Sequence, residues 1–265
     1  MLATAGDNCI DRYLAPVWQS AVGGNAVNVA VGLVAAGLPC RYFGAVGADA
    51  AGRRVSAELV RRGVGIDHLQ RRPQQTAETD LGVDAAGERA ILREVFGACE
   101  AWQPSPEDIL ALRAAGHVHL GWLADAAGLR AALAGADVRV SQDLAVALDE
   151  PAPGLDLAFA SAGPDHIKAR ALLDALSARH AIAVVTCGAK GAVARGGGET
   201  VEVPALAASV VDTTGAGDAF IAGFIAAHHR GAGLAEAMHA GSEAGARACS
   251  HLAGFPQRTE AILST

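Results

Sequence analysis

The chain has 265 residues, of which 51% are apolar and 18% are charged, and its formal net charge is -7. This balance excludes a disordered polymer, and no apolar run approaches the roughly 18 residues that span a bilayer, so we expect a soluble protein with no membrane partner. The negative charge offers no basic footprint for nucleic acid, which is therefore not expected as a partner. The length is typical of a single large domain with a substantial core.

The thiols and the first residues predict a cytoplasmic protein. The five cysteines are scattered without C-x-x-C pairing, as Cys9, Cys40, Cys99, Cys187 and Cys249. That pattern is typical of reduced thiols rather than of a disulfide framework or a zinc site. The stretch from Met1 to Ala5 has no basic region followed by an apolar one, so no secretory signal is predicted there.

Short apolar stretches with strand character alternate with helical segments along most of the chain. The strands are expected at residues 2–5, 42–46, 118–120, 138–140, 157–160 and 182–186. Asp49 can cap a helix that runs to about Arg62, with Gly63 as its stop. The sequence Q-P-S-P-E-D at 103–108 opens another helix that should end near Gly116. This alternation predicts an α/β fold with a mainly parallel sheet covered on both faces.

One stretch departs from the alternation. Two strand-like runs, 76–83 and 88–95, are joined by D-A-A-G at 84–87, which predicts a β-hairpin. With the segment 11–21, this hairpin can form a small sheet over one edge of the domain. We therefore expect a single domain, 1–265, with a small lid formed by about 11–21 and 73–97. The lid could also be a homodimer contact, and a plain edge extension is the alternative.

The run V-V-D-T-T-G-A-G-D-A-F-I-A-G-F at 210–224 carries the strongest chemical signal. Gly215, Ala216 and Gly217 leave the backbone uncovered just before an apolar helix, so their N–H groups can converge on an anion. Asp218 falls in the first helical turn, where the helix dipole favours an ionised carboxylate that can deprotonate an alcohol. Plain helix capping is the competing interpretation of this pattern.

Four stretches resemble motifs of the ribokinase-like carbohydrate kinases, the phosphofructokinase B family, and they follow one another along the chain as they do in that family. They are D-T-T-G-A-G-D at 212–218, S-A-V-G-G-N-A-V-N-V-A-V-G-L at 20–33, G-A-V-G-A-D-A-A-G at 44–52 and V-V-T-C-G-A-K-G-A-V at 184–193. The resemblance implies a three-layer α/β sandwich with a small β lid. It also implies transfer of the γ-phosphoryl group of ATP to a sugar hydroxyl, with Mg²⁺ arriving on the nucleotide.

The resemblance assigns roles to individual positions. Asp218 matches the catalytic base and Gly215, Ala216 and Gly217 match the anion hole. Matches to the sugar pocket are Asp11, Gly23, Gly24, Asn25 and Asn28. Matches to the nucleotide side are Thr186, Gly188, Gly191 and Ser161. Asp212 and the carbonyl group of Thr214 match a monovalent-cation site, which would hold K⁺.

Finer motifs, A-T-A-G-D-N-C-I-D at 3–11 and D-L-A-F-A-S-A at 156–162, are similar to the fructoselysine 6-kinase branch. The expected acceptor is thus a primary hydroxyl of a sugar or of a fructosamine-type adduct. Alternatives are a ribokinase or nucleoside-kinase specificity, or a catalytically silent sugar- or nucleotide-binding protein. A nicotinamide enzyme and a P-loop kinase are disfavoured because neither G-x-G-x-x-G after the first strand nor a Walker A motif is present.

The chain also departs from the family pattern. The N-x-x-E stretch, which organises magnesium and phosphate, should fall near 161–165, where only Asp165 could substitute. Asp143 resembles the first residue of D-x-N-x-R, but Ala145 and Ala147 replace the Asn and Arg. Asn25 stands where ribokinases proper have Lys. We therefore expect altered phosphate handling and a different polarity in the sugar pocket.

Overall fold

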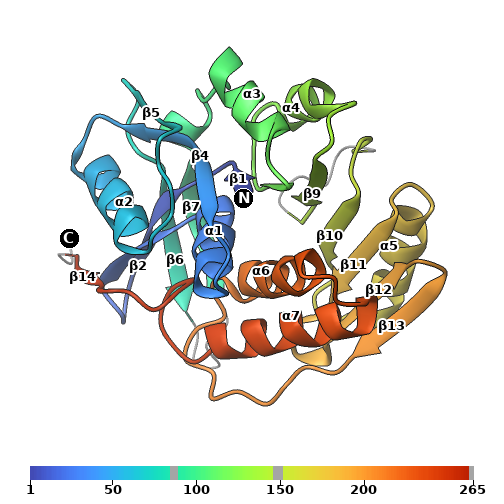
Figure 1. Ribbon diagram of the computed structural model, residues 1–265. Coiled ribbons are helices and arrows are strands. Elements are labelled where there is room, and N and C mark those ends of the chain that lie inside the picture. Colours follow the sequence, from blue (N-terminus) through green and yellow to red (C-terminus); the bar gives the residue numbers. More distant parts are fainter. Residues whose placement is uncertain (84–88, 146–151, 263–265) are drawn as a thin grey trace.

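A large nine-stranded sheet forms the centre of the computed structural model, which describes residues 1–83, 89–145 and 152–262 (Figure 1). Its strands lie in the order β13-β12-β11-β10-β9-β8-β1-β4-β5. Their bounds are β1 Leu2–Ala5, β4 Cys40–Gly47, β5 Leu69–Arg72, β8 His117–Leu120, β9 Arg139–Asp143, β10 Leu157–Ser161, β11 Ile182–Thr186, β12 Ala192–Gly196 and β13 Glu199–Val203. Pairing is parallel from β5 to β11 and antiparallel through β12 and β13.

Helices cover both faces of this sheet and complete three layers. Their bounds are α1 Asn25–Ala35, α2 Ala50–Arg61, α3 Pro106–Arg113, α4 Ala126–Leu133, α5 His166–Ser177, α6 Ala216–His229 and α7 Leu234–Ala248, with short 3₁₀ turns η1 Gly97–Cys99 and η2 Gly188–Lys190. Figure 1 shows α6 lying between α1 and α7. Within the described residues, no helix is both long and apolar enough to cross a membrane.

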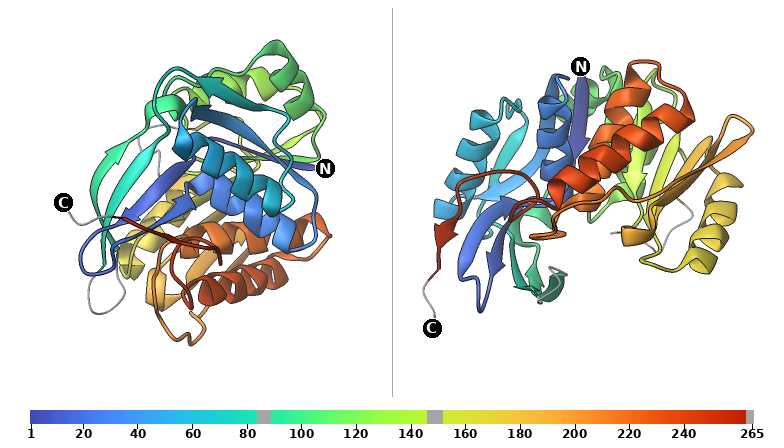
Figure 2. Two further views of the ribbon diagram at one scale, coloured as in Figure 1. Left: turned by 90° about the vertical axis from the view of Figure 1, so that its left-hand side faces the viewer. Right: turned by 90° about the horizontal axis from the view of Figure 1, so that it is seen from below.

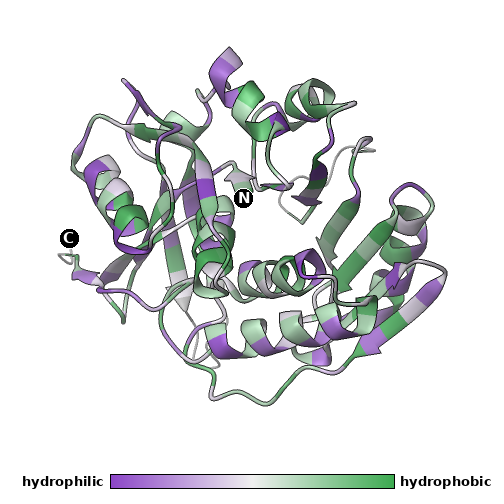
Figure 3. Cartoon of the chain, in the orientation of Figure 1, coloured by the Kyte–Doolittle hydropathy of each residue, from purple (hydrophilic) through white to green (hydrophobic). Residues whose placement is uncertain are grey.

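The large sheet has a separate apolar core on each face, because neighbouring side chains on a strand point to opposite faces. Tyr42 packs with residues of α1 and α6 on one face, while Phe43 packs with residues of α3 and α4 on the other. Apolar residues run along β10 and β11 (Figure 3). Those on one face of the two strands pack on α5. The predicted fold class is confirmed by this arrangement, and both faces of the sheet are buried as a parallel sheet requires.

The predicted helix boundaries are close to the observed ones. Asp49 is the N-cap of α2 and accepts a hydrogen bond from Gly52 N, and the helix stops at Arg62 before Gly63. Ser105 caps α3 in a reciprocal capping box with Asp108. This helix ends at Arg113, earlier than expected, and the chain turns into β8 without needing the glycine that follows.

A second, five-stranded sheet projects from the main body (Figure 2). It has the order β14-β3-β2-β6-β7, with bounds β2 Cys9–Tyr13, β3 Gln19–Gly23, β6 Glu78–Val83, β7 Arg89–Val95 and β14 Glu260–Ala261. β6 and β7 are antiparallel, as a hairpin requires, whereas β2 and β6 are parallel. The expected turn at 84–87 lies outside the described residues. The strand β14 was not expected, because two residues carry no readable pattern.

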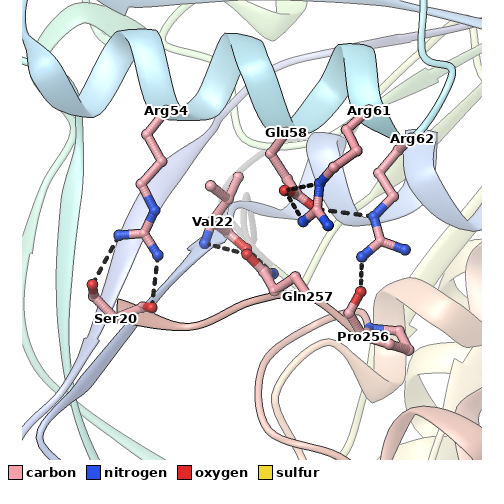
Figure 4. Close-up of polar contacts among 8 residues, drawn as sticks. All are labelled: Ser20, Val22, Arg54, Glu58, Arg61, Arg62, Pro256 and Gln257. Carbon is pink, nitrogen blue, oxygen red and sulfur yellow. Dashed lines mark hydrogen bonds and ion pairs between the residues drawn. The ribbon is translucent and has the colours of Figure 1, made fainter. Parts of the chain in front are cut away.

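Polar contacts from α2 and the C-terminal segment hold this small sheet at its base (Figure 4). Arg54 donates to the Ser20 side chain at 2.8 Å and to its carbonyl oxygen at 2.7 Å. Gln257 makes a two-way bond with the Val22 backbone, with both distances 2.8 Å. Arg62, held by Glu58, donates to the carbonyl oxygen of Pro256. The strand that leads into α1 is thereby fixed to the main domain.

Candidate active site

The glycine-rich run ends at the N-terminus of α6. Gly215 is the N-cap with a φ of 74°, and a Cβ there would lie 2.4 Å from the Gly254 Cα, so both the turn and the packing require glycine. Ala216 N donates back to the carbonyl of Thr213 at 3.2 Å, so this amide closes the turn. Gly217 is exposed, and a Cβ there would meet no atom within 4 Å. The backbone at Gly217 is therefore accessible at the start of α6, where first-turn amides without helical partners can bind an anion.

Asp218 lies in the first turn of α6, and two asparagines of α1 hold its carboxylate. Asn25 Nδ2 donates to Asp218 Oδ1 at 2.6 Å, and Asn28 Nδ2 donates to Oδ2 at 2.7 Å. Both asparagines are buried, whereas Asp218 is partly exposed. Each carboxylate oxygen is therefore oriented by a neutral donor, and the charge stays at the surface of the site.

The second carboxylate of this cluster belongs to Asp143, at the end of β9. It is buried and accepts a hydrogen bond from Asn25 Nδ2 at 2.8 Å. Burial and the charge of Asp218 raise the pKa of Asp143 to about 7. The sequence indicates Asp143 as the first residue of an incomplete D-x-N-x-R motif, but no sequence pattern predicts its contact with Asn25.

Asp11 and the glycine pair lie together at the start of α1. A Cβ on Gly23 would lie 2.0 Å from Asp11 Oδ2, so only glycine admits the carboxylate. Gly24 adopts a φ of 105° and a Cβ there would lie 2.5 Å from the Asn8 Cα. Cys9 Sγ donates to Asp11 Oδ1 at 3.2 Å. The predicted sugar-side residues are thus brought into one cluster around the start of α1.

Asp7 supports this cluster and was missed as a site residue. Its partly buried carboxylate accepts from Asn25 N at 2.8 Å, Ala26 N at 3.3 Å and Trp122 N at 3.1 Å. Burial raises the pKa of Asp7 in spite of these donors. Since Asp7 precedes α1 by two strands, its capping role has no local sequence signal.

Asp212 anchors the loop before α6. Its Oδ1 accepts from Thr214 N at 2.9 Å and Thr214 Oγ1 at 2.7 Å. Its Oδ2 accepts from the Tyr13 hydroxyl at 2.7 Å and from Ala253 N at 2.8 Å. Asp212 therefore connects the small sheet, the loop before α6 and the segment after α7. Tyr13 was not predicted, because it lies 199 residues away in sequence.

The residues predicted to face the nucleotide lie at or just beyond the carboxyl ends of β10 and β11. Ser161 and Thr186 are register partners, and Thr186 Oγ1 donates to the carbonyl oxygen of Ala160 at 3.3 Å. Gly188 is exposed with a φ of 52°, while a Cβ on Gly191 would lie 2.0 Å from the Val203 carbonyl oxygen. β9, which carries Asp143, is the neighbour of β10, so both groups occupy the same edge of the sheet.

Other polar residues take structural roles. Asp165 caps α5, accepting from Ile167 N at 2.9 Å and Lys168 N at 3.0 Å. His117 and His119 share the hydroxyl of Ser141, and burial lowers the pKa of each to about 3. Among the residues that the structure describes, no group of three or more His, Cys, Asp or Glu side chains could hold a metal ion.

Comparisons with known proteins identify the family of this chain. The family model described as "pfkB family carbohydrate kinase" matches residues 11–149 and 152–255. A fructoselysine 6-kinase from Shigella flexneri is 34% identical over 253 residues, covering 93% of this chain and 96% of that protein.

Solved structures show the same fold. Arabidopsis thaliana ribokinase, complexed with ribose and ATP, superposes with a TM-score of 0.81 at 24% identity, covering 94% of this chain and 92% of that one. An Escherichia coli candidate ribokinase II in complex with ATP and Mg²⁺ gives a TM-score of 0.79 at 20% identity, covering 96% and 94%. The fold is ribokinase-like, and the predicted enzyme class is confirmed by the family match. The chain belongs to the pfkB family of carbohydrate kinases.

Proposed function

We propose that this kinase transfers the γ-phosphoryl group of ATP to a primary hydroxyl of a sugar or a fructosamine-type adduct. One observation carries the proposal. The Asp218 carboxylate is oriented by Asn25 and Asn28, at 2.6 and 2.7 Å, in the first turn of a helix whose exposed Gly217 faces open space. A base and an anion-binding backbone therefore lie within one helical turn.

The proposed reaction follows from this arrangement. Asp218 accepts the proton of the substrate hydroxyl as the oxygen attacks the γ-phosphorus. The new O–P bond forms while the bond from the γ-phosphorus to the β,γ-bridging oxygen breaks, and ADP leaves with that oxygen. The amides of Gly217 and Asp218 stabilise the charge on the transferring group, since those of Ala216 and Ala219 donate to backbone carbonyls. Mg²⁺ bound with the nucleotide would supply further neutralisation of phosphate charge.

The nucleotide would lie along the carboxyl ends of β10 and β11, against Thr186, Gly188, Gly191 and Ser161. The exposed backbone at Gly188 fits a bound phosphate or base, because no side chain blocks it. The relatives solved with ATP support this assignment, and we place Mg²⁺ on the nucleotide phosphates rather than on a carboxylate cage.

A K⁺ ion near Asp212 and Thr214 stays a prediction. Asp212 already accepts four hydrogen bonds from the protein, so the ion would be held mainly by carbonyl oxygens such as that of Thr214. Exchange of KCl for choline chloride at constant ionic strength tests this assignment. A lower rate in choline is expected, and an unchanged rate would reject the ion.

The positions of two carboxylates on the small sheet favour an acceptor that carries an amine. Thr79 pairs in register with Asp11 on one side and with Glu94 on the other. These residues share one face of the sheet, because side chains alternate along each strand. Tyr13, two residues after Asp11, meets Asp212 on that face, so the face looks toward the site. A second carboxylate there, about 10 Å from Asp11 at ordinary strand spacing, suits a cationic substrate tail.

We further propose that the small sheet acts as a lid and that its outer edge is a homodimer contact. Light scattering at micromolar concentration tests the dimer, and a monomer would reject it.

The five cysteines are all free thiols in the structure, which supports the proposed cytoplasmic location.

A substrate panel separates catalysis from silent binding. The purified protein would be assayed for ADP formation with fructoselysine, fructose, ribose and adenosine, with Mg²⁺ and ATP present. We expect the largest kcat/KM with fructoselysine. The silent alternative is motivated by Asp165, which serves as a helix cap instead of replacing the missing N-x-x-E residues. Sugar binding by calorimetry without ADP formation on any acceptor would favour that alternative.

A further inference from the structure

The proposed reaction leaves Asp143 without a role, although it is one of the most enclosed carboxyl groups near the site. It is the last residue of β9 and only 7% exposed. Its Oδ1 accepts from Ala145 N at 2.9 Å, and its Oδ2 accepts from Asn25 Nδ2 at 2.8 Å. An enclosed carboxyl with two neutral donors and no cation among them is costly to ionise, so its presence calls for a reason.

Asn25 joins Asp143 to the proposed base. Its single Nδ2 atom donates to Asp143 Oδ2 at 2.8 Å and to Asp218 Oδ1 at 2.6 Å. An amide nitrogen carries two hydrogens, so both are used and the side chain can hold only one orientation. The two acceptor oxygens must then lie within about 5 Å of each other. At that separation, two charges in a partly buried site interact strongly.

The surroundings of Asp143 make its charge sensitive to pH near neutrality. Two carboxylates face it, Asp218 on α6 and Asp7 in the turn after β1, and both oppose its ionisation together with burial. The donors from Asn25 on α1 and from Ala145 favour the ionised form. From β10, the register partner is Phe159, which brings no charge. The pKa of Asp143 is raised to about 7 as a result.

We propose that Asp143 is a positioning residue that orients Asn25 and, when ionised, strengthens Asp218 as a base through their shared amide. This inference rests on the proposed kinase function and adds a coupled carboxylate pair to it. An ionised Asp143 makes Asp218 hold a proton more tightly, since the two negative charges repel. The two carboxyl groups then lose their protons in two coupled steps as the pH rises. Activity is expected to rise with pH mainly through the second of these steps.

The variant Asp143→Asn removes the charge and can keep an acceptor for Asn25. We expect kcat to fall about tenfold, because Asp218 becomes a weaker base. We also expect the acid limb of the kcat/KM profile to move about one pH unit lower, since Asp218 then gives up its proton more easily. Asp108→Asn is the matched control, because Asp108 is equally buried but lies with His68 and Ser105, away from the site.

The position of the acid limb of the kcat/KM profile decides the test. A folded Asp143→Asn protein, judged by an unchanged thermal midpoint, with the acid limb of the wild type would overturn the inference whatever its kcat. A purely structural role predicts that outcome, because weakened packing lowers the rate without moving the limb. Asp108→Asn should leave both the rate and the limb unchanged.

A second measurement uses the unaltered protein and needs no substrate. Carboxyl-carbon NMR of isotope-labelled protein follows Asp143 and Asp218 directly as pH changes. We expect each resonance to titrate in two steps at shared midpoints, as interacting groups do. Independent single-step curves would reject the coupling. Since this experiment needs no turnover, coupled titration in a protein that makes no ADP would contradict the proposed function and leave the carboxylate pair intact.

Discussion

The proposed acceptor end of the site and its proposed nucleotide end are built differently. At the acceptor end, the carboxylates of Asp218 and Asp143 are held by buried amides at 2.6 to 2.8 Å. At the nucleotide end, Gly188 is exposed and a Cβ on it would meet nothing within 4 Å. The first end is fixed by side chains from distant elements, whereas the second presents open backbone at Gly188.

This difference shows where each end obtains its selectivity. A pocket with paired donors and acceptors discriminates by leaving buried polar groups unmatched when the wrong substrate binds. An open backbone surface offers shape and amide groups that tolerate small changes. Substitutions at the proposed acceptor end should therefore change turnover and substrate choice, and a substitution at Gly188 should change little.

The largest effect is expected for Asp218→Asn. The amide cannot accept the substrate proton, so kcat should fall about a thousandfold or more, with KM changed much less. Steady-state ADP formation with the preferred acceptor measures this change. Turnover near that of the unaltered protein would remove Asp218 from the mechanism. Calorimetric binding of ATP to the variant serves as the control for folding.

Gly215→Ala should follow in size. The residue has a φ of 74°, and its new Cβ would lie 2.4 Å from the Gly254 Cα, where only backbone could yield. We expect a loss of about 2 to 4 kcal/mol in the free energy of unfolding, from left-handed strain and overpacking together. Urea unfolding gives the value. A loss below about 0.5 kcal/mol would show that the turn relaxes freely.

Glu94→Gln should act on substrate choice alone. If its charge meets the substrate amine at a partly exposed site, its loss costs about 1 kcal/mol, or about fivefold in KM for fructoselysine. The KM for fructose, which has no amine, should not change. Arg93→Gln is the neighbouring control, since Arg93 faces the opposite side and donates to Asp80 Oδ2 at 2.8 Å. Equal effects on both sugars would contradict the assignment.

The smallest effect is expected for Gly188→Ala. Its φ of 52° makes alanine mildly strained, but open space surrounds the position. The KM for ATP should stay within about twofold of the original value. A tenfold rise would mean that the nucleotide contacts this backbone as closely as the acceptor contacts its own pocket, and the contrast between the two ends would disappear.

Local sequence patterns predict several of the elements that surround the candidate site. The turn before α6, the cap at Asp49 and most strands of the large sheet follow from glycine placement, capping residues and apolar runs. The partners of these residues did not follow. Asn25 and Asp143 are 118 positions apart, and the Tyr13 and Asp212 pair spans 199. Such contacts arise only when the strand order is known, and one-dimensional patterns do not contain it.

Segment 253–257 contacts the loop before α6, helix α1 and strand β3. Ala253 N reaches Asp212, Gly254 packs against Asn28 and Gly215, and Gln257 grips Val22. A chain shortened before residue 253 would therefore lose three contacts at once: the amide that Asp212 accepts, the packing on Gly215 and the hydrogen bonds to Val22. The C-terminal segment thus couples the stability of the small sheet to that of the loop before α6, although the two are far apart in sequence.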